Sequence, residues 1–188
     1  KADYAYARGF TGDNIKVGVL DTGIKCNHTD LDDNMSSITY TTQFGDGCND
    51  THGHGTHVAG LLSATSNNST GIASTAFNCS ILPVKCTGDN EDNGYITNGY
   101  EGILYAAQAG YNAEGFVIIN CSWGGLGSSI FEQASINNIH NNYNAVIFAA
   151  SGNGSDTGWG EDYAAQYPCS YENVISITAL GQNGTWNH

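Results

Sequence analysis

Five short segments of the chain are apolar at both odd and even positions, which sets them apart from strands with one face in water. These segments are Ile15–Leu20, Ser80–Lys85, Phe116–Asn120, Asn144–Ala150 and Val174–Ala179. Strands of a parallel sheet that is covered on both faces have this composition. The pattern therefore predicts a parallel sheet buried between two layers.

Between these segments the apolar residues follow a helical period. Helices are predicted over about His54–Ala64, Ile96–Ala109 and Ser129–Asn141. Alternation of strands and helices indicates an α/β fold, a doubly wound and mainly parallel sheet with helices on both faces. No linker or repeat interrupts the pattern, so residues 1–188 are expected to form a single domain.

Polar side chains follow three of the predicted strands directly. Asp21 comes after the first strand, Ser122 after the third and Asn153 after the fourth. Doubly wound sheets place their chemistry at the carboxyl ends of the strands. We therefore expect these three side chains to converge on one crevice.

Charge and hydropathy exclude some classes of partner. The 188 residues include 5 Lys and Arg against 18 Asp and Glu, a formal net charge of -13. That sign disfavours nucleic acid and anionic membrane surfaces as partners. No apolar run approaches the roughly 18 residues that a membrane-spanning helix needs.

Cysteines and glycosylation signals favour a secreted protein. The cysteines are Cys26, Cys48, Cys79, Cys86, Cys121 and Cys169. None is spaced as C-x-x-C, which argues against a zinc cluster. We expect at least one disulfide, with Cys121 the best candidate for a free thiol because it adjoins a buried strand. The Asn-X-Ser/Thr acceptors are Asn27, Asn34, Asn49, Asn67, Asn68, Asn78 and Asn183.

An aspartate at the end of a buried strand and a histidine at the head of a helix are two parts of a charge-relay hydrolase. Asp21 would fix the imidazole tautomer of His54, and His54 would act as the base. On propensity alone, Asp21 could instead cap the turn before Gly23. His52, His54 and His57 could also be metal ligands, although no carboxylate follows at the zincin spacing.

The motifs D-T-G, H-G-T-H-V-A-G, S-W-G-G and A-A-S-G-N occur in this order from Asp21 to Asn153. Together they resemble the subtilisin-like serine peptidases (subtilases), and the likeness extends from about Ile15 to Ala179. The resemblance implies that Asp21 is the triad aspartate, His54 the general base and Asn153 the oxyanion-hole amide. It implies an extended peptide or protein as substrate.

Two glycine-containing segments resemble the walls of the family's primary specificity pocket. They consist of Ser122, Trp123, Gly124 and Gly125, and of Ala150, Ser151 and Gly152. An exposed strand edge can pair with the main chain of an extended peptide. The family usually has Leu where Trp123 stands, so the indole is expected to narrow or cover a neighbouring subsite.

A structural calcium ion is also expected from the resemblance. Asp30 resembles a family calcium ligand, and the loop with Asn67 and Asn68 resembles the segment that completes the site with amide and backbone oxygens. Calcium takes about six to eight oxygen ligands. An ordinary Asn/Ser turn, or a glycan acceptor, is the alternative interpretation of this loop.

The nucleophilic serine of the family's G-T-S motif is not found in the sequence. Gly127–Ser129 and Gly154–Ser155 are the nearest imitations, and both precede the last strand. We expect the chain to be about the N-terminal two-thirds of a longer peptidase, whose remaining segment supplies the serine and covers an otherwise exposed apolar face. The alternative is a catalytically inactive subtilisin-fold module with a binding or structural role. A nucleotide-binding domain is disfavoured, because no phosphate-binding glycine motif follows the first strand.

Overall fold

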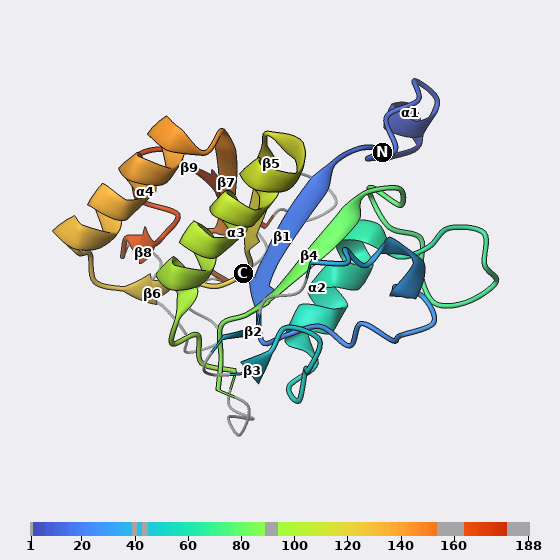
Figure 1. Ribbon diagram of the computed structural model, residues 1–188, viewed down its shortest axis with the longest axis horizontal. Helices are drawn as coiled ribbons and strands as arrows, with labels where there is room; N and C mark the ends of the chain where they lie inside the picture. Colours follow the sequence, from blue (N-terminus) through green and yellow to red (C-terminus); the bar gives the residue numbers. More distant parts are fainter. Residues whose placement is uncertain (1, 39–40, 43–44, 89–93, 154–163, 180–188) are drawn as a thin grey trace.

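The five predicted strands form one parallel sheet. The computed structural model describes residues 2–38, 41–42, 45–88, 94–153 and 164–179. The strands are β1 (Lys16–Asp21), β4 (Ser80–Lys85), β5 (Val117–Cys121), β7 (Ala145–Ala150) and β9 (Val174–Ile177). Their order is β4-β1-β5-β7-β9, with β1 between β4 and β5 (Figure 1). Each lies within two residues of its predicted bounds, which confirms the predicted α/β sheet.

Helices cover both faces of this sheet, as predicted. Helices α3 (Gly99–Glu114) and α4 (Ile130–Asn142) pack on one face, and α2 (His54–Ser63) contacts β1 and β4 (Figure 1). Alternate residues of β1 enter separate cores because side chains of a strand alternate between faces. Leu20 belongs to the core under α3, whereas Val17 and Val19 belong to the core with α2.

Helix α3 differs from its prediction at both ends. It begins at Gly99 rather than Ile96 and runs five residues past Ala109, to Glu114. The predicted end at Ala109 directly precedes Gly110, but this glycine lies inside the helix. A Cβ on Gly110 would come 2.3 Å from the Cβ of Val117, so glycine permits the close packing of α3 on β5. The helix ends instead at Gly115, with φ 76°, the left-handed conformation common after a helix.

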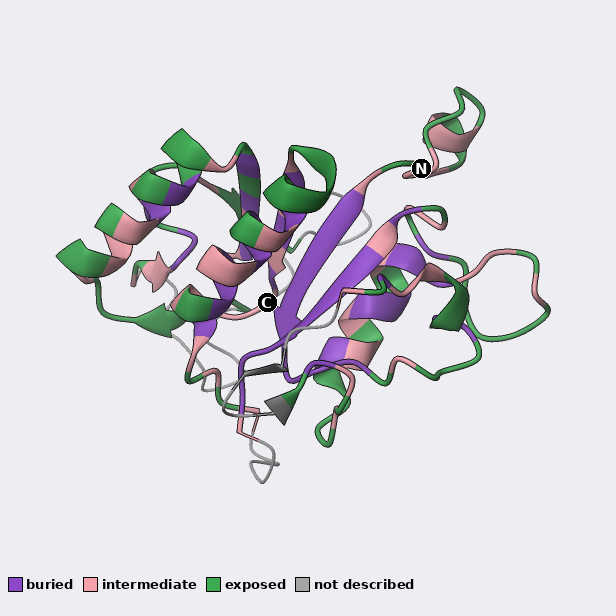
Figure 2. Cartoon of the chain, in the orientation of Figure 1, coloured by how far each residue is buried: buried purple, intermediate pink, exposed green. Residues whose placement is uncertain are grey.

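One part of the sheet is not covered by the described residues. Strand β1 is buried throughout, whereas β7 and β9 have exposed residues (Figure 2). Among these are Val146 of β7, 42% exposed, and Ile175 and Ile177 of β9, 45% and 51% exposed. The described residues therefore leave one face of β7 and β9 open, as expected for a sheet that is incomplete at its C-terminal side. A groove of about 430 Å³ runs along this face, on the same side as α2. Among its lining residues are Val17, Leu62, Ile118, Phe148 and Ile177.

Several short elements lie outside the main sheet and its helices. They are helix α1 (Ala2–Tyr6), the 3-10 turn η1 (Asp32–Asn34), the antiparallel pair β2 (Thr41–Thr42) and β3 (Gly45–Asp46), and the antiparallel pair β6 (Gly125–Leu126) and β8 (Gln166–Tyr167). None of the helices in the described ranges is long and apolar enough to cross a membrane.

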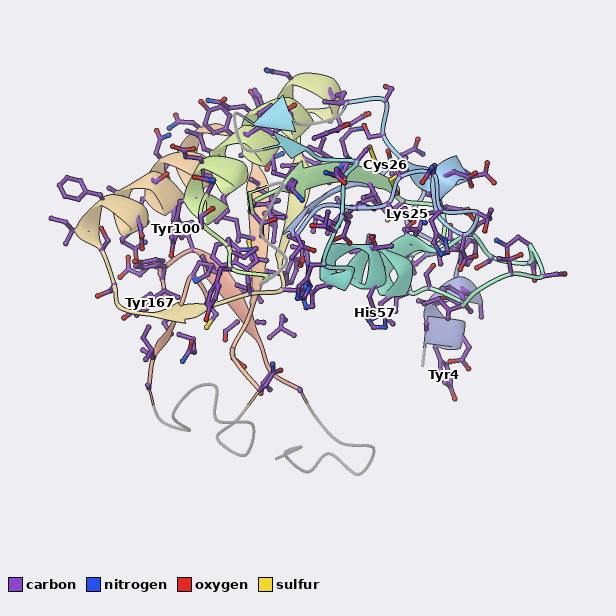
Figure 3. All side chains as sticks on the ribbon, turned by 90° about the horizontal axis from the view of Figure 1, so that it is seen from below. Tyr4, Lys25, Cys26, His57, Tyr100 and Tyr167 are labelled. Carbon is purple, nitrogen blue, oxygen red and sulfur yellow. A yellow bond between two sulfur atoms is a disulfide. The ribbon has the colours of Figure 1, made fainter. Side chains whose placement is uncertain are left out.

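The cysteines confirm the prediction of at least one bridge. Cys26 and Cys48 form a disulfide between the loop after β1 and the loop before α2 (Figure 3 labels Cys26). Cys121 is free and buried, as predicted. Cys79, Cys86 and Cys169 are free and buried as well. Burial raises the pKa of the Cys79 thiol.

Candidate active site

Asp21 and His54 meet at the carboxyl end of the sheet. Asp21 is the last residue of β1 and only 1% exposed, and His54 is the first residue of α2. Nδ1 of His54 lies 2.7 Å from Oδ1 of Asp21. The same oxygen accepts a hydrogen bond from the backbone N–H of Thr22 at 2.8 Å. The carboxylate is thus hydrogen-bonded by the imidazole, as a charge relay requires.

A glycine allows this approach of helix to strand. A Cβ on Gly55 would come 2.1 Å from the carbonyl oxygen of Gly23 and 2.9 Å from the Cβ of Asp21. Gly23 itself has φ 104°, a conformation that L side chains rarely adopt. The first turn of α2 can rest directly on the chain leaving β1 because both positions are glycine.

The carboxylate sets the protonation of the imidazole. The hydrogen bond from His54 to Asp21 raises the pKa of His54; partial burial opposes this, and the charges of Asp21 and Asp50 add to the increase. With its Nδ1 proton donated to Asp21, neutral His54 has its free lone pair on Nε2. The side chain is 45% exposed, so a solvent-borne hydroxyl can reach that nitrogen. The arrangement can take a proton from such a hydroxyl.

The other two histidines do not form a metal centre with His54. His57 is exposed and lies on the outer side of α2 (Figure 3). The ring of His52 is edge-on to that of His54, with centroids 6.3 Å apart. Among the described residues, which include all three, no group of three or more His, Cys, Asp or Glu side chains could hold a metal ion. The alternative of an H-x-H-x-x-H metal site finds no support.

The two predicted pocket walls lie at the same edge as Asp21. Leu20, Cys121 and Ala149 are in register across β1, β5 and β7, so the segments that follow them leave the sheet together. Strand β6 continues the first wall and pairs with β8. Ser122 accepts a hydrogen bond from the side chain of Asn120 at 2.9 Å.

A residue that the sequence did not single out lies between the two walls. Positions for a Cβ on Gly124 and on Gly152 are each 3.7 Å from the side chain of Gln166, at its Cβ and Cγ respectively. No motif marks Gln166. It reaches this place through the pairing of β8 with β6, which spans about 40 residues of sequence and cannot be read from local pattern.

Trp123 is directed inward rather than left free over the crevice. Its Nε1 donates a hydrogen bond to the carbonyl oxygen of Leu20 at 2.9 Å, and its ring lies edge-on to Tyr100. A Cβ on Gly99 would come 2.3 Å from the indole, so the helix start fits closely against it. The ring joins β1 to α3. That it narrows a subsite stays a prediction.

Asn153 lies three residues beyond the end of β7, at the same edge of the sheet. It is exposed, and Gly152 before it has φ 115°. The N–H of Ser151 is bonded to the carbonyl oxygen of Ile177, which holds the segment against β9. The amide is thus accessible to a ligand in the crevice. Gly154–Ser155, one of the imitations of the serine motif, lies outside the described residues.

Two of the predicted calcium residues, Asp30 and Asn68, come together, but through a hydrogen bond within the loop. Oδ1 of Asp30 accepts from the side-chain amide of Asn68 at 2.7 Å, and Oδ2 accepts from the N–H of Ile72 at 2.9 Å. The oxygen of the Asn68 amide accepts from the N–H of Thr70 at 3.1 Å. Asn67 is exposed, with φ 62°. The bond from Asn68 is the largest cause that lowers the pKa of Asp30.

An acidic residue before α2 was also missed from the sequence. Asp50 accepts hydrogen bonds from the backbone N–H groups of His52, Gly53 and Thr56. An acidic residue just ahead of a predicted helix is a known N-terminal signal. Asp50 could therefore have been identified from the sequence, but the histidines of the same segment are the more conspicuous candidates.

The fold and the site define a class: an α/β protein with a hydrogen-bonded aspartate–histidine pair at the carboxyl edge of its sheet. Its sequence matches the subtilase family, peptidase family S8, over residues 12–186. The chain belongs to this family. It is 38% identical to thermitase of Thermoactinomyces vulgaris over 178 residues and 34% identical to subtilisin DY of Bacillus licheniformis over 188 residues.

Solved structures agree with this assignment. The S41 psychrophilic protease and sphericase each superpose with a TM-score of 0.76, at 31% and 30% identity, over 94% of this chain. In each case the match covers only part of the relative. It spans 57% of thermitase, 62% of subtilisin DY and 58% of both solved chains.

Proposed function

We propose that this chain carries the aspartate, the histidine and the oxyanion-hole amide of a serine endopeptidase. The observation that carries the proposal is the 2.7 Å contact between His54 Nδ1 and Asp21 Oδ1. Nε2 of His54 would take the proton of a serine hydroxyl as it attacks the peptide carbonyl, and would then give that proton to the leaving amine. Asp21 stabilises the imidazolium in between.

Asn153 would meet the developing charge of the tetrahedral intermediate. A fixed amide donor is effective there because it needs no reorganisation when the charge forms. For the asparagine of a subtilisin, a member of the same family, such a donor is worth about 10²–10³ in turnover. An extended peptide would lie along Ser122–Gly125, with a side chain between this wall and Ala150–Gly152.

The serine would come from a segment of the same peptidase outside these 188 residues. Within the described part of the chain, no serine hydroxyl hydrogen-bonds to His54. The exposed side chains of β7 and β9 and the groove beside them are apolar, and a soluble protein covers such a face. A segment that packs on this face would lie on the same side of the sheet as α2, which carries His54.

The test is labelling with a serine-directed fluorophosphonate. The complete protein that contains these residues should label, and its His54→Ala variant should not. The 188-residue chain alone should stay unlabelled. A complete protein that never labels would favour the alternative, an inactive subtilisin-fold module that binds extended peptides.

An extracellular location is proposed from the Cys26–Cys48 disulfide, since such bonds persist in oxidising compartments. One relative is a major intracellular serine protease of Bacillus subtilis, so the family alone does not decide this point.

Glycans would be restricted by the fold. The amide of Asn34 donates to the carbonyls of Ser63 and Phe77, which leaves it unsuited as an acceptor, and Asn183 lies outside the described residues.

A calcium ion at Asp30 is also proposed, with Asn67 and Asn68 of the loop. The residues fit in part: a buried carboxylate faces a loop with amide and carbonyl oxygens. The amide of Asn68 would have to turn its oxygen, instead of its nitrogen, toward the ion. Bound there, calcium would hold the loop to Asp30 and stabilise the fold.

A further inference from the structure

A second carboxylate lies between the end of β1 and the first turn of α2. Oδ1 of Asp50 accepts hydrogen bonds from the hydroxyl of Thr22 at 2.9 Å, from the N–H of Gly53 at 2.8 Å and from the N–H of His52 at 3.2 Å. Thr22 directly follows Asp21, and Gly53 directly precedes His54. One oxygen atom thus contacts the neighbours of both members of the relay pair.

The other oxygen of Asp50 reaches one turn further into the helix. Oδ2 accepts from the N–H of Thr56 at 3.0 Å and from its hydroxyl at 2.5 Å. The same hydroxyl accepts from the N–H of Lys25, in the loop after β1, at 2.9 Å. The hydroxyl of Thr22 accepts from the N–H of Gly55 at 3.0 Å. Each threonine therefore links Asp50 across the gap between strand and helix.

This set of contacts exceeds what a helix cap needs. A capping side chain accepts from one or two N–H groups of the first turn. Asp50 does so and also binds the hydroxyl of Thr22, whose own N–H is bonded to Asp21 at 2.8 Å. Two chains of hydrogen bonds start at Asp50; one leads to the carboxylate of Asp21, and the other to the backbone around His54.

We propose that Asp50 is a positioning residue for the Asp21–His54 pair, which locks the first turn of α2 to the end of β1. Without Asp50, α2 could shift relative to β1, and Nδ1 of His54 would no longer be aligned with the carboxylate of Asp21. A displacement of about 1 Å can cost on the order of 100-fold in rate. The expected loss of rate rests on the proposed peptidase function, whereas the expected displacement of the imidazole from Asp21 does not.

The negative charge of Asp50 also acts on His54. Burial tends to raise the pKa of Asp50, but the hydrogen bonds from Thr56, Gly53 and Thr22 outweigh burial and hold that pKa below its usual range. Asp50 is therefore ionised at neutral pH and favours the protonated form of His54, together with Asp21. His52, Lys25 in the loop after β1 and, behind the strand end, Lys85 are further titratable residues in this region.

Lys85 holds the same region from the opposite side. This lysine is 1% exposed, and its Nζ donates to the carbonyl oxygens of Thr22 and Asn49 at 2.8 Å each. Those residues adjoin Asp21 and Asp50 respectively. The backbone segments that carry the two carboxylates are thus tied together on the side that faces the sheet. This leaves Asp50 to join them to the helix.

The experiment compares Asp50→Asn with Asp46→Asn in this chain by NMR. The matched control removes the same charge four residues earlier, at the end of β3, where the exposed side chain of Asp46 accepts from the N–H of Cys48. In Asp50→Asn the low-field resonance of the His54 Nδ1 proton should weaken or move, and the pKa of His54 should fall. Asp46→Asn should leave both unchanged.

A second pair of variants covers the case in which Asp50→Asn does not fold. Thr22→Val removes the hydroxyl link and should perturb the Nδ1 resonance; Thr22→Ser keeps the hydroxyl and should restore it. In the complete peptidase, Asp50→Asn should lower kcat by up to about 100-fold with KM little changed. A lower melting temperature with an unaltered His54 resonance and pKa would overturn the proposal and leave a simple cap.

These readouts separate the two proposals. The resonance and pKa of His54 need no serine, so they decide the role of Asp50 even in a protein that never labels with fluorophosphonate. Conversely, the complete peptidase could label normally while Asp50→Asn leaves the resonance and pKa of His54 unchanged. That result would support the proposed function and overturn only the positioning role of Asp50.

Discussion

The carboxylate of Asp21 and the imidazole of His54 are joined by a single contact of 2.7 Å, although 33 residues separate them in the chain. Oδ2 of the same carboxylate is buried and has no hydrogen-bond partner among the described residues. The interaction of Asp21 with His54 is therefore carried by Oδ1 alone. This makes the pair sensitive to small changes in the angle between β1 and α2.

The first prediction concerns the pH dependence of activity. The bond to Asp21 is the largest cause that raises the pKa of His54, and a general base must be neutral. Activity of the complete peptidase should therefore fall as the pH drops through a value above 6.5, the ordinary pKa of histidine. In Asp21→Asn this midpoint should move down, and turnover should fall on the order of 10⁴-fold, the size seen for the matching change in a triad.

Stability should respond to pH in the opposite sense. A group whose pKa is raised by folding contributes stability below its unfolded pKa, and this contribution is lost as the pH rises through the folded value. The side chain of His54 is nearly half exposed, so its contribution to the free energy of unfolding is small. The check is an NMR titration of His54 beside melting temperatures from about pH 5 to 9. An unraised pKa for His54 would contradict the relay geometry.

The second prediction tests how closely α2 must approach β1. In Gly55→Ala the new Cβ would meet the carbonyl of Gly23 and the side chain of Asp21, so the helix must move away. Overpacking of this kind costs about 1–3 kcal/mol, and the Nδ1 contact should weaken with it. Gly125→Ala is the control, because a Cβ there meets nothing within 4 Å. Melting temperature and the His54 resonance distinguish the two variants.

The third prediction concerns the cysteines. A denaturing thiol titration without reductant should give four free thiols, since two of the six cysteines are bonded to each other. The Cys26→Ser/Cys48→Ser double variant should lose about 3 kcal/mol of stability, as expected for a bridge 22 residues apart. Six thiols in the titration would remove both the bridge and the main support for an extracellular location.

The sequence predicted the strands, the helices and the positions of Asp21 and His54 because these depend on local pattern. Apolar runs and a specific motif are sufficient to place Asp21 at a strand end and His54 at a helix start. The length of α3 was missed, since Gly110 acts in packing against Val117 and not as a stop. Its role depends on a contact that only the fold creates.

Contacts between distant segments account for the remaining differences. Gln166 reaches the space between Gly124 and Gly152 through the pairing of β8 with β6. Trp123 turns inward because the carbonyl of Leu20 is there to accept its N–H. The exposed side of β7 and β9 was expected only from the resemblance, as their apolar sequence alone is typical of strands buried on both faces. Burial is decided by what packs on a strand, which its own residues do not specify.

The fourth prediction concerns the acid stability of the Asp30 loop. The hydrogen bonds from Asn68 and from the N–H of Ile72 lower the pKa of Asp30. A depressed pKa contributes stability above the unfolded value of 3.8, and this contribution is lost as the pH falls through the folded value. Asp30→Asn should therefore lower the melting temperature at neutral pH but much less at the lowest pH where the chain stays folded. An equal effect at both values would show that the charge of Asp30 does not matter.

The last prediction concerns calcium at the same loop. An excess of chelator should lower the melting temperature, because an ion that binds only the folded chain stabilises it by about 2.7 kcal/mol at 100 times its Kd. Asn68→Asp gives the sharper test. Without calcium, the new carboxylate would face that of Asp30 in place of an amide donor, and the variant should melt below the wild type. With calcium, two carboxylates bind the ion more strongly, and stability should return. If chelator changes the melting temperature of neither the wild type nor Asn68→Asp, the loop is held by its hydrogen bonds alone and the calcium proposal fails.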